Sequence, residues 1–434
     1  MLTKKKLSKR RVTAAVSSFL LLTFIIGCGS QEELSGDRNL IPDNNQTESH
    51  YNTANETTNS NNKISSNAKD VSQLEETPVI PVGTSEWRRT NFRKLLADLD
   101  IEEISSGSVG RDGIPPIYNP LFISIQEAEE IEWLTGDNPV AIVEMHGNVK
   151  AYPLGILTFH EVVNDTIGDT PVVLTYCPLC YTAIGFIREV NGTVLNFGTT
   201  GNLRRSNLIM WDDFTESWWQ QITGQAIIGD LAGESLDTVS VNISSFDEYK
   251  RSYPKGLVLS PDSTNYDMDE IYGKNPYVRY DAPNTQPFMF KQYIDKRLDP
   301  VERVLGININ EDYLAIPFTS LEESLVRELE HNGEEIVVFY NDRTLSALDK
   351  ELIVESRIAG SASVFSPYIN GEKIYFYNDN GVITDKGTNS KWSQLGQAYE
   401  GPLMGETLDT IEATNILWFA WASFHPETGI AFIK

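Results

Sequence analysis

The sequence predicts an α+β protein that is rich in β-strands and consists of two tandem homologous repeats with a pseudo-two-fold relation. The first observation is an internal duplication, in which the segment from Gly224 aligns with that from Gly396 at an offset of 172 residues. An earlier segment from Ala151 aligns with that from Ala315 at an offset of 164. Both copies contain short, β-branched apolar runs of strand length and few runs of helical spacing. Each repeat is therefore expected to be β-rich.

The run TSLEESLVRELEHNG, which begins at Thr319, predicts a helix in the second repeat. Its leucines recur every four residues, Ser320 and Glu323 have the spacing of a capping box, and the pair Asn-Gly at Asn332 is a typical helix end. The offset of 164 places the same helix at residues 154–165 in the first repeat.

Strands and hairpins are expected around these helices. The run EEIVVFY, residues 334–340, is short and β-branched, which predicts a buried strand, and the offset predicts another at 171–176. The segments GFIREVNGTVLNFG and EKIYFYND have the pattern of hairpins around Asn-Gly turns, because Asn-Gly readily adopts positive φ.

Residues 1–27 have the composition of a lipoprotein signal peptide. A basic head precedes an apolar stretch, and the run Ile25-Ile26-Gly27-Cys28 fits a bacterial lipobox. We expect cleavage before Cys28 and attachment of lipid to its thiol, which places the protein outside the cytoplasm and anchors it to a bacterial membrane. The alternative is an uncleaved membrane-spanning anchor, for which the apolar stretch is shorter than the roughly 20 residues that a bilayer requires.

The rest of the chain divides into a tether and a body. Residues 28–83 begin with the lipidated cysteine and continue in Asn, Ser, Thr and acidic residues without apolar periodicity, which predicts a disordered tether. The body contains a first repeat, residues 84–270, and a second, degenerate repeat, residues 271–434. The tether would hold the body clear of the membrane surface.

The formal net charge of the chain is −26. Removal of the predicted leader, which holds six lysines and arginines and no acidic residue, makes the mature chain more acidic still. Nucleic acid and anionic lipid are poor partners for such a surface. The membrane is therefore expected as a partner through the lipid anchor alone, and the sequence identifies no protein partner.

Apart from the lipidated Cys28, the mature chain keeps two cysteines, Cys177 and Cys180, in the run TYCPLC. Outside the cytoplasm disulfides are permitted, and no cytosolic reductant keeps thiols reduced. The second repeat carries other residues at the positions of these cysteines and of a nearby histidine: Asn341 for Cys177, Thr344 for Cys180 and Ser324 for His160. Because the second repeat is expected to fold without them, the three residues are expected to serve function.

The segment YPLGILTFHEVVNDTIGDTPVVLTYCPLCYTAIGF, followed by TESWWQQITGQAIIGDLAG and the terminal WFAWASFHPETG, resembles the bacterial and archaeal family known as domain of unknown function 3179. The resemblance covers nearly all of the body from about Gly113. It implies that His160, Cys177 and Cys180 are motif positions, and it implies no reaction. The run NLRRSNLIMWDD departs from the family, which more often looks like a Tyr-Asn-Ser-Asp run there.

One interpretation of the three residues is a site for a soft metal ion. Thiolates and an imidazole suit copper first and zinc second, whereas magnesium and calcium prefer oxygen ligands. His160, Cys177 and Cys180 would leave one position free for substrate, water or a fourth ligand such as Met210. The protein would then bind copper or carry out metal-dependent redox chemistry at the cell envelope.

Two other interpretations stay open. Cys177 and Cys180 could form a thiol–disulfide redox couple, although the glutaredoxin-like version requires a helix that starts at the first cysteine, and CPLCYTAIGFIREVNG runs instead into a β-rich segment. Alternatively, the pair could form a permanent disulfide in a non-catalytic envelope binding module. The sequence leaves open whether the protein is an enzyme.

The sequence lacks the common hydrolase and nucleotide-binding motifs. It contains no phosphate-binding glycine loop, no G-x-S-x-G, no H-E-x-x-H and no dinucleotide fingerprint. Asp212, Asp213 and Glu216 could form an acid/base pair, but a charged turn is the favoured interpretation because turns favour aspartate. His146 lies in a predicted turn, EMHGNVK, where a lone histidine is a weak metal candidate.

Overall fold

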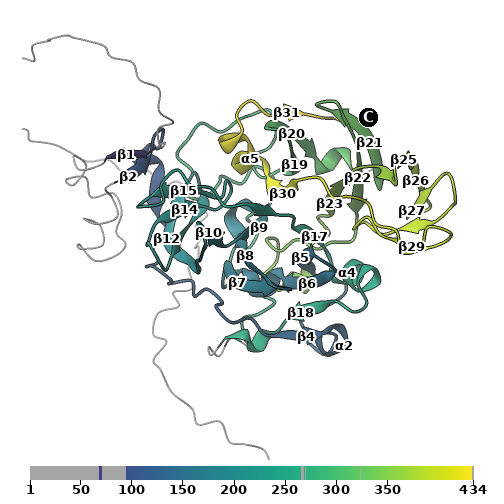
Figure 1. Cartoon of the computed structure of the whole chain (residues 1–434), viewed down its shortest axis with the longest axis horizontal. Helices are drawn as coiled ribbons and strands as arrows, with labels where there is room; N and C mark the ends of the chain where they lie inside the picture. Colours follow the sequence, from purple (N-terminus) through teal and green to yellow (C-terminus); the bar gives the residue numbers. More distant parts are fainter. Residues whose placement is uncertain (1–67, 71–93, 265–267, 269, 323, 433–434) are drawn as a thin grey trace, which may run out of the picture. The chain divides into compact units, whose positions relative to one another are not determined.

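The computed structural model describes residues 68–70, 94–264, 268, 270–322 and 324–432 (Figure 1). The predicted signal peptide, the lipid attachment at Cys28 and most of the tether lie outside the described residues. Within them, no helix is both long and apolar enough to cross a membrane. The lipid anchor and the location outside the cytoplasm therefore stay predictions.

Strands make up most of the regular structure, which confirms the β-rich class. The helices are short: α2 (Ile125–Ala128), α3 (Leu154–Leu157), α4 (Phe246–Ser252), α5 (Trp418–Phe424) and the 3₁₀ turns η1 (Ile101–Glu103), η2 (Pro178–Cys180), η3 (Pro261–Ser263), η4 (Phe318–Ser320) and η5 (Ile353–Glu355).

The first part of the chain forms three sheets and a small hairpin (Figure 1). One sheet has the order β17-β5-β6-β18-β4, with β4 (Phe122–Ser124), β5 (Pro139–Met145), β6 (Asn148–Pro153), β17 (Asn242–Ser245) and β18 (Leu257–Leu259). A second has the order β16-β9-β8-β7, with β7 (Val162–Ile167), β8 (Thr170–Cys177), β9 (Thr182–Ile187) and β16 (Thr238–Val239). The third has the order β1-β2-β15-β14-β13-β12-β3, with β1 (Ala68–Asp70), β2 (Lys94–Leu96), β3 (Ile104–Ser106), β12 (Phe197–Arg204), β13 (Asn207–Asp212), β14 (Trp218–Gln220) and β15 (Gln225–Ile228). The hairpin is β10 (Glu189–Val190) and β11 (Thr193–Val194).

The later part of the chain also forms three sheets and a small hairpin. One has the order β30-β19-β20-β31, with β19 (Arg303–Ile309), β20 (Asp312–Pro317), β30 (Ala413–Leu417) and β31 (Gly429–Ile430). The others are β21 (Val326–His331), β22 (Glu334–Asn341) and β23 (Ser361–Phe365), and then β26 (Phe376–Asp379), β27 (Val382–Asp385), β28 (Lys391–Trp392) and β29 (Ala398–Glu400). The hairpin is β24 (Tyr368–Ile369) and β25 (Glu372–Lys373).

The same succession of pairings occurs in both parts. β17-β5-β6-β18 corresponds to β30-β19-β20-β31, and β18 pairs parallel with β6 as β31 does with β20. The strands β5 to β8 begin and end 164 residues before β19 to β22, while α4 begins and ends 172 residues before α5. These are the two offsets at which the sequence aligns with itself.

A polar turn of the same construction follows β13 and β27. The carboxylate of Asp212 accepts hydrogen bonds from the backbone N–H and the hydroxyl of Thr215 at 2.5 and 3.0 Å. Asp385 accepts the equivalent bonds from Thr388 at 2.6 and 3.0 Å. Each carboxylate also accepts the indole N–H of a tryptophan on the next strand. The acidic residues at 212–216 thus build a turn, as the sequence favours.

The helices predicted at 154–165 and from Thr319 are wrong. α3 has only four residues and β7 follows it, while in the second segment residues 326–331 form β21. Asn332 and Gly333, with φ of 49° and 80°, form the two-residue turn of the β21–β22 hairpin. Every residue of β21 pairs with one of β22, so strand pairing overrides the weak helical preference of the segment.

Two predicted strands and a predicted Asn-Gly turn are confirmed. The strands predicted at 171–176 and 334–340 are β8 and β22. Asn191 and Gly192, with φ of 51° and 76°, join β10 to β11 as expected. Positive φ at both central residues is the conformation that a two-residue hairpin turn requires.

The largest hydrophobic core includes buried residues from both parts of the chain. Tyr176 and Leu157 belong to it, and so do Val304 and Trp418. The hydroxyls of Thr182 on β9 and Thr414 on β30 lie 3.1 Å apart. The two parts are therefore joined by packing as well as by the chain.

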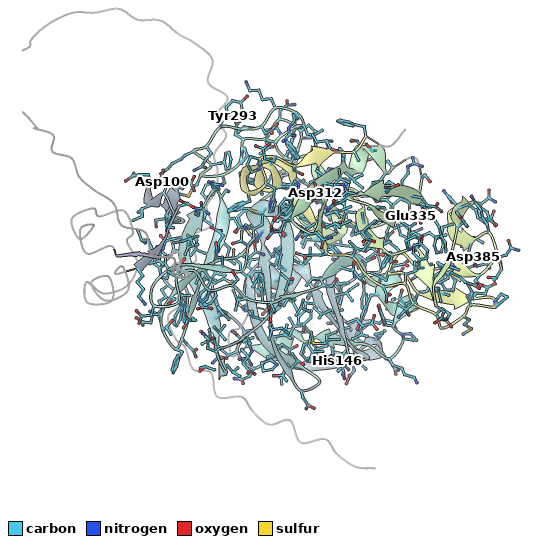
Figure 2. All side chains as sticks on the ribbon, turned by 45° about the horizontal axis from the view of Figure 1, so that its top comes forward. Asp100, His146, Tyr293, Asp312, Glu335 and Asp385 are labelled. Atoms are coloured by element: carbon cyan, nitrogen blue, oxygen red, sulfur yellow. The ribbon has the colours of Figure 1, made fainter. Side chains whose placement is uncertain are left out.

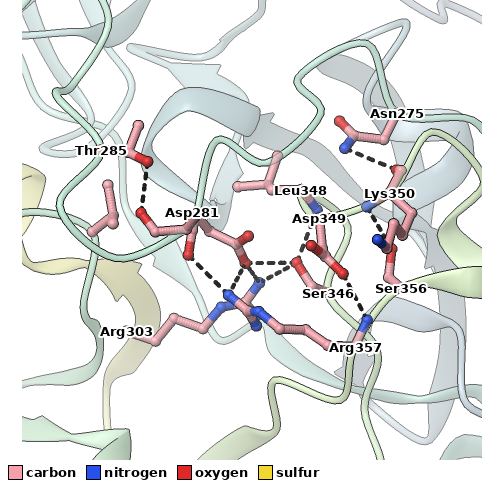
Figure 3. A network of polar contacts seen from close by, with 12 residues as sticks. Asn275, Asp281, Thr285, Arg303, Ser346, Leu348, Asp349, Lys350, Ser356 and Arg357 are labelled. Atoms are coloured by element: carbon pink, nitrogen blue, oxygen red, sulfur yellow. Dashed lines mark hydrogen bonds and ion pairs between the residues drawn. The ribbon is translucent and has the colours of Figure 1, made fainter.

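A segment without strands connects the two parts. Among its described residues, the connecting segment (residues 270–302) contains neither helix nor strand. The carboxylate of Asp281 fastens it to the later part of the chain, since it accepts hydrogen bonds from the guanidinium of Arg303 (2.9 Å) and the hydroxyl of Ser346 (2.6 Å) and forms an ion pair with Arg357 (3.0 Å) (Figure 3). All three partners lie beyond the connecting segment in sequence, so this network ties it down at its centre.

Candidate functional site

Cys177 and Cys180 lie where β8 ends and the one-turn helix η2 begins. Both side chains are buried, with 2% and 0% of their surface exposed, and both are free thiols in the structure. Cys177 is the residue that caps η2, and Tyr181, at φ 52°, ends it. The sequence predicted that no helix starts at the first cysteine, but the structure has one 3₁₀ turn there. The chain then enters β9, as expected.

Both thiols face the backbone carbonyl of Ser206. Its oxygen lies 3.9 Å from Sγ of Cys177 and 3.5 Å from Sγ of Cys180, and each thiol can donate to it. Ser206 and the preceding Arg205 form the turn between β12 and β13 with φ of 63° and 51°, which turns the carbonyl toward the thiols. This turn belongs to the run NLRRSNLIMWDD that departs from the family resemblance, so that run supplies part of the site.

Asn207 adds a donor from the side of β13. Its amide N–H donates to Sγ of Cys180 at 3.5 Å. Two glutamines hold the amide in place, because Gln221 accepts from it at 2.7 Å and Gln220 donates to its oxygen at 2.6 Å. The donor is therefore fixed before any reaction takes place.

The two thiols differ in acidity. Burial by itself raises the pKa of Cys177, but hydrogen bonds from the Cys180 thiol and from the backbone N–H groups of Leu208, Cys180 and Leu179 outweigh burial and lower it. The pKa of Cys180 is raised well above its ordinary value by burial and by its donation to Cys177. The pair is therefore asymmetric, with Cys177 the readier thiolate.

His160 is engaged away from the thiols. Nδ1 lies 2.7 Å from the carbonyl oxygen of Pro115 and Nε2 lies 2.7 Å from the hydroxyl of Tyr272. Since a carbonyl only accepts, Nδ1 carries the proton and Nε2 accepts from Tyr272. Burial lowers the pKa of His160, which favours the neutral ring. Neither nitrogen is free to bind a metal in this arrangement.

The metal ligands expected from the sequence do not form a ligand set in this structure. Among the described residues, no group of three or more histidine, cysteine, aspartate or glutamate side chains is arranged to hold a metal ion. Met210 is buried on β13 within the hydrophobic core, where it stands opposite Thr199 and Trp219. His146 lies at φ 52° in the exposed turn between β5 and β6, as its sequence predicts (Figure 2).

Glu161 is a site residue that sequence reasoning missed. Its backbone adopts φ 57°, its carbonyl accepts from the N–H of Tyr176 at 2.7 Å, and its side chain is 8% exposed. Burial raises the pKa of Glu161 well above its ordinary value, and the nearby charge of Cys177 raises it further. The matching residue of the later part is Leu325. A buried acid where the aligned position is leucine is the signal that could have identified it.

Tyrosines of the connecting segment complete the surroundings of the thiols. Burial raises the pKa of Tyr277, and the charges of Glu161 and Cys177 raise it further. Burial also raises the pKa of Tyr280, with smaller contributions from the charges of both cysteines. The hydroxyl of Ser206 donates to the carbonyl of Phe288 at 2.5 Å, which ties the connecting segment to the turn over the thiols.

A comparison with protein families matches residues 111–428 to the model of a protein of unknown function, DUF3179. The chain belongs to the DUF3179 family. The match covers both parts of the body and includes every residue of the site described above. No curated protein and no solved structure matches the chain.

Proposed function

We propose that this DUF3179 protein is a dithiol–disulfide redox protein of the bacterial cell envelope, with Cys177 and Cys180 as its reactive pair. The observation that carries the proposal is a pair of free, buried thiols that face one carbonyl, that of Ser206, and have unlike surroundings, since the Asn207 amide donates to Cys180 alone. The lowered pKa of Cys177 and the raised pKa of Cys180 agree with this arrangement. Thiol–disulfide exchange needs a thiolate that attacks first and a second thiol that resolves the intermediate.

The chemistry assigns one role to each sulfur. The Cys177 thiolate attacks one sulfur of a substrate disulfide, and the other substrate sulfur leaves as a thiolate that takes up a proton. Cys180 then loses its proton and attacks Sγ of Cys177 in the mixed disulfide, which releases the second substrate thiol. The substrate gains two electrons and the pair becomes a disulfide. The reverse sequence oxidises a substrate dithiol.

Glu161 is suited to handle the proton of this exchange. Its carboxyl lies close enough to both cysteines for its charge to affect the pKa of Cys180 and for Cys177 to affect its own. Because its raised pKa keeps Glu161 protonated, its carboxyl can first give a proton to the substrate thiolate that leaves when Cys177 attacks. We assign the carboxylate that remains the proton that Cys180 releases when it attacks in turn.

A soft metal ion is the second candidate for the same pair, with copper favoured over zinc. The supporting observation is that both sulfurs face one point, the carbonyl of Ser206. Two thiolates are ligands that copper(I) prefers. His160 would become a ligand only after Nε2 gives up the hydroxyl of Tyr272, and Met210 is a still weaker candidate.

The proposal also includes where the protein is located and its origin from a duplicated repeat. The signal-peptide pattern supports a lipoprotein that is anchored through Cys28 and separated from the membrane by the tether, residues 28–83. The matching strand bounds support two homologous repeats, residues 84–270 and 271–434, with a pseudo-two-fold relation and a site in the first alone.

The decisive experiment is equilibration of the protein in glutathione redox buffers, followed by alkylation and mass measurement. We expect Cys177 and Cys180 to interconvert reversibly between dithiol and disulfide while the protein stays folded. Cys180→Ala should accumulate a mixed disulfide with glutathione on Cys177, and Cys177→Ala should not. A pair that opens only on unfolding would instead support the structural disulfide of a binding module.

The metal candidate is tested separately with the thiols kept reduced. Copper and zinc stoichiometry and affinity are measured for the wild type, Cys177→Ser and His160→Ala. If copper binds through the pair alone, Cys177→Ser loses it and His160→Ala keeps it. If the wild type binds neither ion more tightly than Cys177→Ser does, the metal candidate is rejected.

A further inference from the structure

A group of buried polar atoms beside the dithiol lacks hydrogen-bond partners. It comprises Nε and Nη1 of Arg303, the hydroxyls of Tyr176 and Tyr181, and Oδ1 of Asp281. Arg303 is 6% exposed, Asp281 is 3% exposed, and both tyrosines are fully buried. The guanidinium of Arg303 can donate to the Tyr181 oxygen, which still leaves the O–H groups of both tyrosines, one guanidinium nitrogen and Oδ1 of Asp281 without partners. Because buried polar groups in native proteins are nearly always paired, these atoms indicate a ligand site. We refer to these four residues as the Arg303 cluster.

The Arg303 cluster is compact and adjoins the thiols. The guanidinium carbon of Arg303 lies 3.6 Å from the centre of the Tyr181 ring, and the rings of Tyr176 and Tyr181 meet edge to face with centres 6.3 Å apart. Tyr176 directly precedes Cys177, and Tyr181 directly follows Cys180. Arg303 is the first residue of β19, so the second part of the chain supplies a cation to a site whose thiols belong to the first.

The one carboxylate of the cluster is shared between two guanidinium groups. Among the described residues, Asp281 is the only carboxylate that pairs with the guanidinium groups of Arg303 and Arg357. The side chain of Arg357 is 43% exposed and can be solvated, whereas that of Arg303 is 6% exposed. Apart from Oδ1 of Asp281, the atoms left without partners are N–H or O–H groups, which can donate to an anion. A buried guanidinium with spare donors is suited to a carboxylate.

We propose that the Arg303 cluster binds the carboxylate of a low-molecular-weight disulfide or thiol that reacts with Cys177. The proposal rests on the redox function proposed above and adds the class of substrate. The remaining unpaired atom, Oδ1 of Asp281, is an acceptor and suits an ammonium group. The best substrate is therefore an α-amino acid disulfide, whose carboxylate meets Arg303 and the tyrosines and whose ammonium meets Asp281.

The aligned position supports a role beyond the fold. Arg303 begins β19, and the residue at the same place in β5 is Pro139. The strand therefore forms in the first part without an arginine. Arg303 is therefore not needed to begin the strand, and its guanidinium stacks on the ring of Tyr181, the residue after Cys180.

Four disulfides with the same two-carbon arm test the proposal on the reduced full-length protein. They are cystine, 3,3′-dithiodipropionate, cystamine and bis(2-hydroxyethyl) disulfide, and the rate of thiol loss is measured for each. We expect cystine and dithiodipropionate to react at least tenfold faster than the neutral disulfide, and cystamine to gain no such advantage. Any opening motion that exposes the thiols is common to all four. Because the four leaving thiols differ in acidity, each rate is divided by the rate of the same disulfide with a simple thiol in solution, and the corrected ratio reports recognition.

Three variants locate the recognition. Arg303→Gln should abolish the preference for carboxylate, measured as the ratio of its rates with dithiodipropionate and with the neutral disulfide, and Arg303→Lys should restore part of that ratio. Arg357→Gln is the matched control, because it removes the other partner of Asp281 without removing an unpaired buried donor, and it should keep the preference. Thermal unfolding in propionate gives a second readout, since binding should raise the Tm of the wild type and not that of Arg303→Gln.

The outcomes separate the two proposals. If the wild type reacts with none of the four disulfides, the redox function itself fails. If it reacts with all four at similar rates, the redox function stands and the carboxylate site is rejected. The same rejection follows if Arg303→Gln keeps the preference, because the unpaired atoms then hold only water.

Discussion

The hydroxyl of Tyr272 lies 2.7 Å from Nε2 of His160, so the connecting segment is hydrogen-bonded to the chain just before β7. Removal of this hydroxyl in Tyr272→Phe should lower the free energy of unfolding by about 1 kcal/mol, because it leaves a buried nitrogen without its donor. Denaturant unfolding measures the loss. Tyr293→Phe is the control, since the Tyr293 side chain is 80% exposed and should be neutral (Figure 2).

The same contact determines which nitrogen of the His160 ring carries the proton. His160 should be neutral near pH 7 with its proton on Nδ1, which nitrogen NMR of the labelled ring detects. A proton on Nε2 would contradict the hydrogen-bond assignment and would leave Nδ1 facing a carbonyl without a donor.

The acidity of Cys177 should depend on Cys180. Cys180→Ala removes a donor to the thiolate, so the pKa of Cys177 should rise by about one unit or more, since hydrogen bonds to charged groups contribute about 1.5–3 kcal/mol. The pH dependence of alkylation by iodoacetamide, followed by mass, measures this change. In Cys177→Ala, the remaining Cys180 should react slowly at neutral pH because burial raises its pKa. Identical pH profiles for Cys177 in the wild type and in Cys180→Ala would refute the donor role.

Glu161 should make stability fall as the pH rises. Its pKa in the folded protein is raised above the ordinary value of 4.5, so the folded state holds a proton that the unfolded chain releases. The stabilisation is fully present below that value and is lost as pH rises through the folded pKa. Glu161→Gln should therefore be more stable than the wild type at alkaline pH and should show a flatter profile. The exposed Glu189→Gln should follow the wild-type profile at every pH.

The ion-pair network of Asp281 should control access to the thiols. Asp281→Asn leaves Arg303 buried without its counter-charge, and the loss of one partner of a buried pair costs about 3–5 kcal/mol. The connecting segment should then open more often, and a bulky maleimide should label Cys177 and Cys180 at least tenfold faster under conditions where the protein remains folded.

A pair within the same segment provides the control. Asp295 and Arg297 form an exposed ion pair at 2.8 Å, and loss of an exposed pair costs little. Asp295→Asn should therefore leave labelling unchanged. If Asp281→Asn loses stability but the thiols stay as slow to react as before, the connecting segment does not govern their access.

Cys28→Ala should release the protein from the membrane fraction or leave it as an uncleaved precursor. The reason is that the lipobox thiol is the predicted point of lipid attachment, and the change touches no described residue. Metabolic labelling with a fatty acid and membrane fractionation measure the outcome. Lipid labelling that persists in the variant would remove the anchor proposal.

The strands of the site could be predicted from sequence, whereas its partners could not. β8 and β22 were predicted because short β-branched runs leave little choice of structure. The segment that became β21 has leucines at helical spacing, and only its pairing with β22 decides between helix and strand. Such pairing depends on residues outside the window in which periodicity is measured.

The contact of Ser206 with the thiols could not be predicted from the sequence for a related reason. Its carbonyl meets the thiols because Arg205 and Ser206 both adopt positive φ, and the pair Arg-Ser is not a turn signal as Asn-Gly is. The tyrosines of the connecting segment have no aligned counterpart, so the duplication that marked Cys177 as functional could not mark them. Glu161 could have been identified from the sequence, since the comparison that paired His160 with Ser324 pairs the next residue, Glu161, with Leu325.

The shared hydrophobic core affects how the thiols are exposed while the chain is being exported. If the chain crosses the membrane from its N-terminus as we propose, Cys177 and Cys180 emerge well before Arg303, Ile416 and Trp418, which complete the core around them. During translocation the thiols are therefore uncovered in an oxidising compartment, where enzymes of disulfide formation can reach them. The newly exported protein should carry the pair already oxidised, and its first encounter in the envelope should be with a reductant.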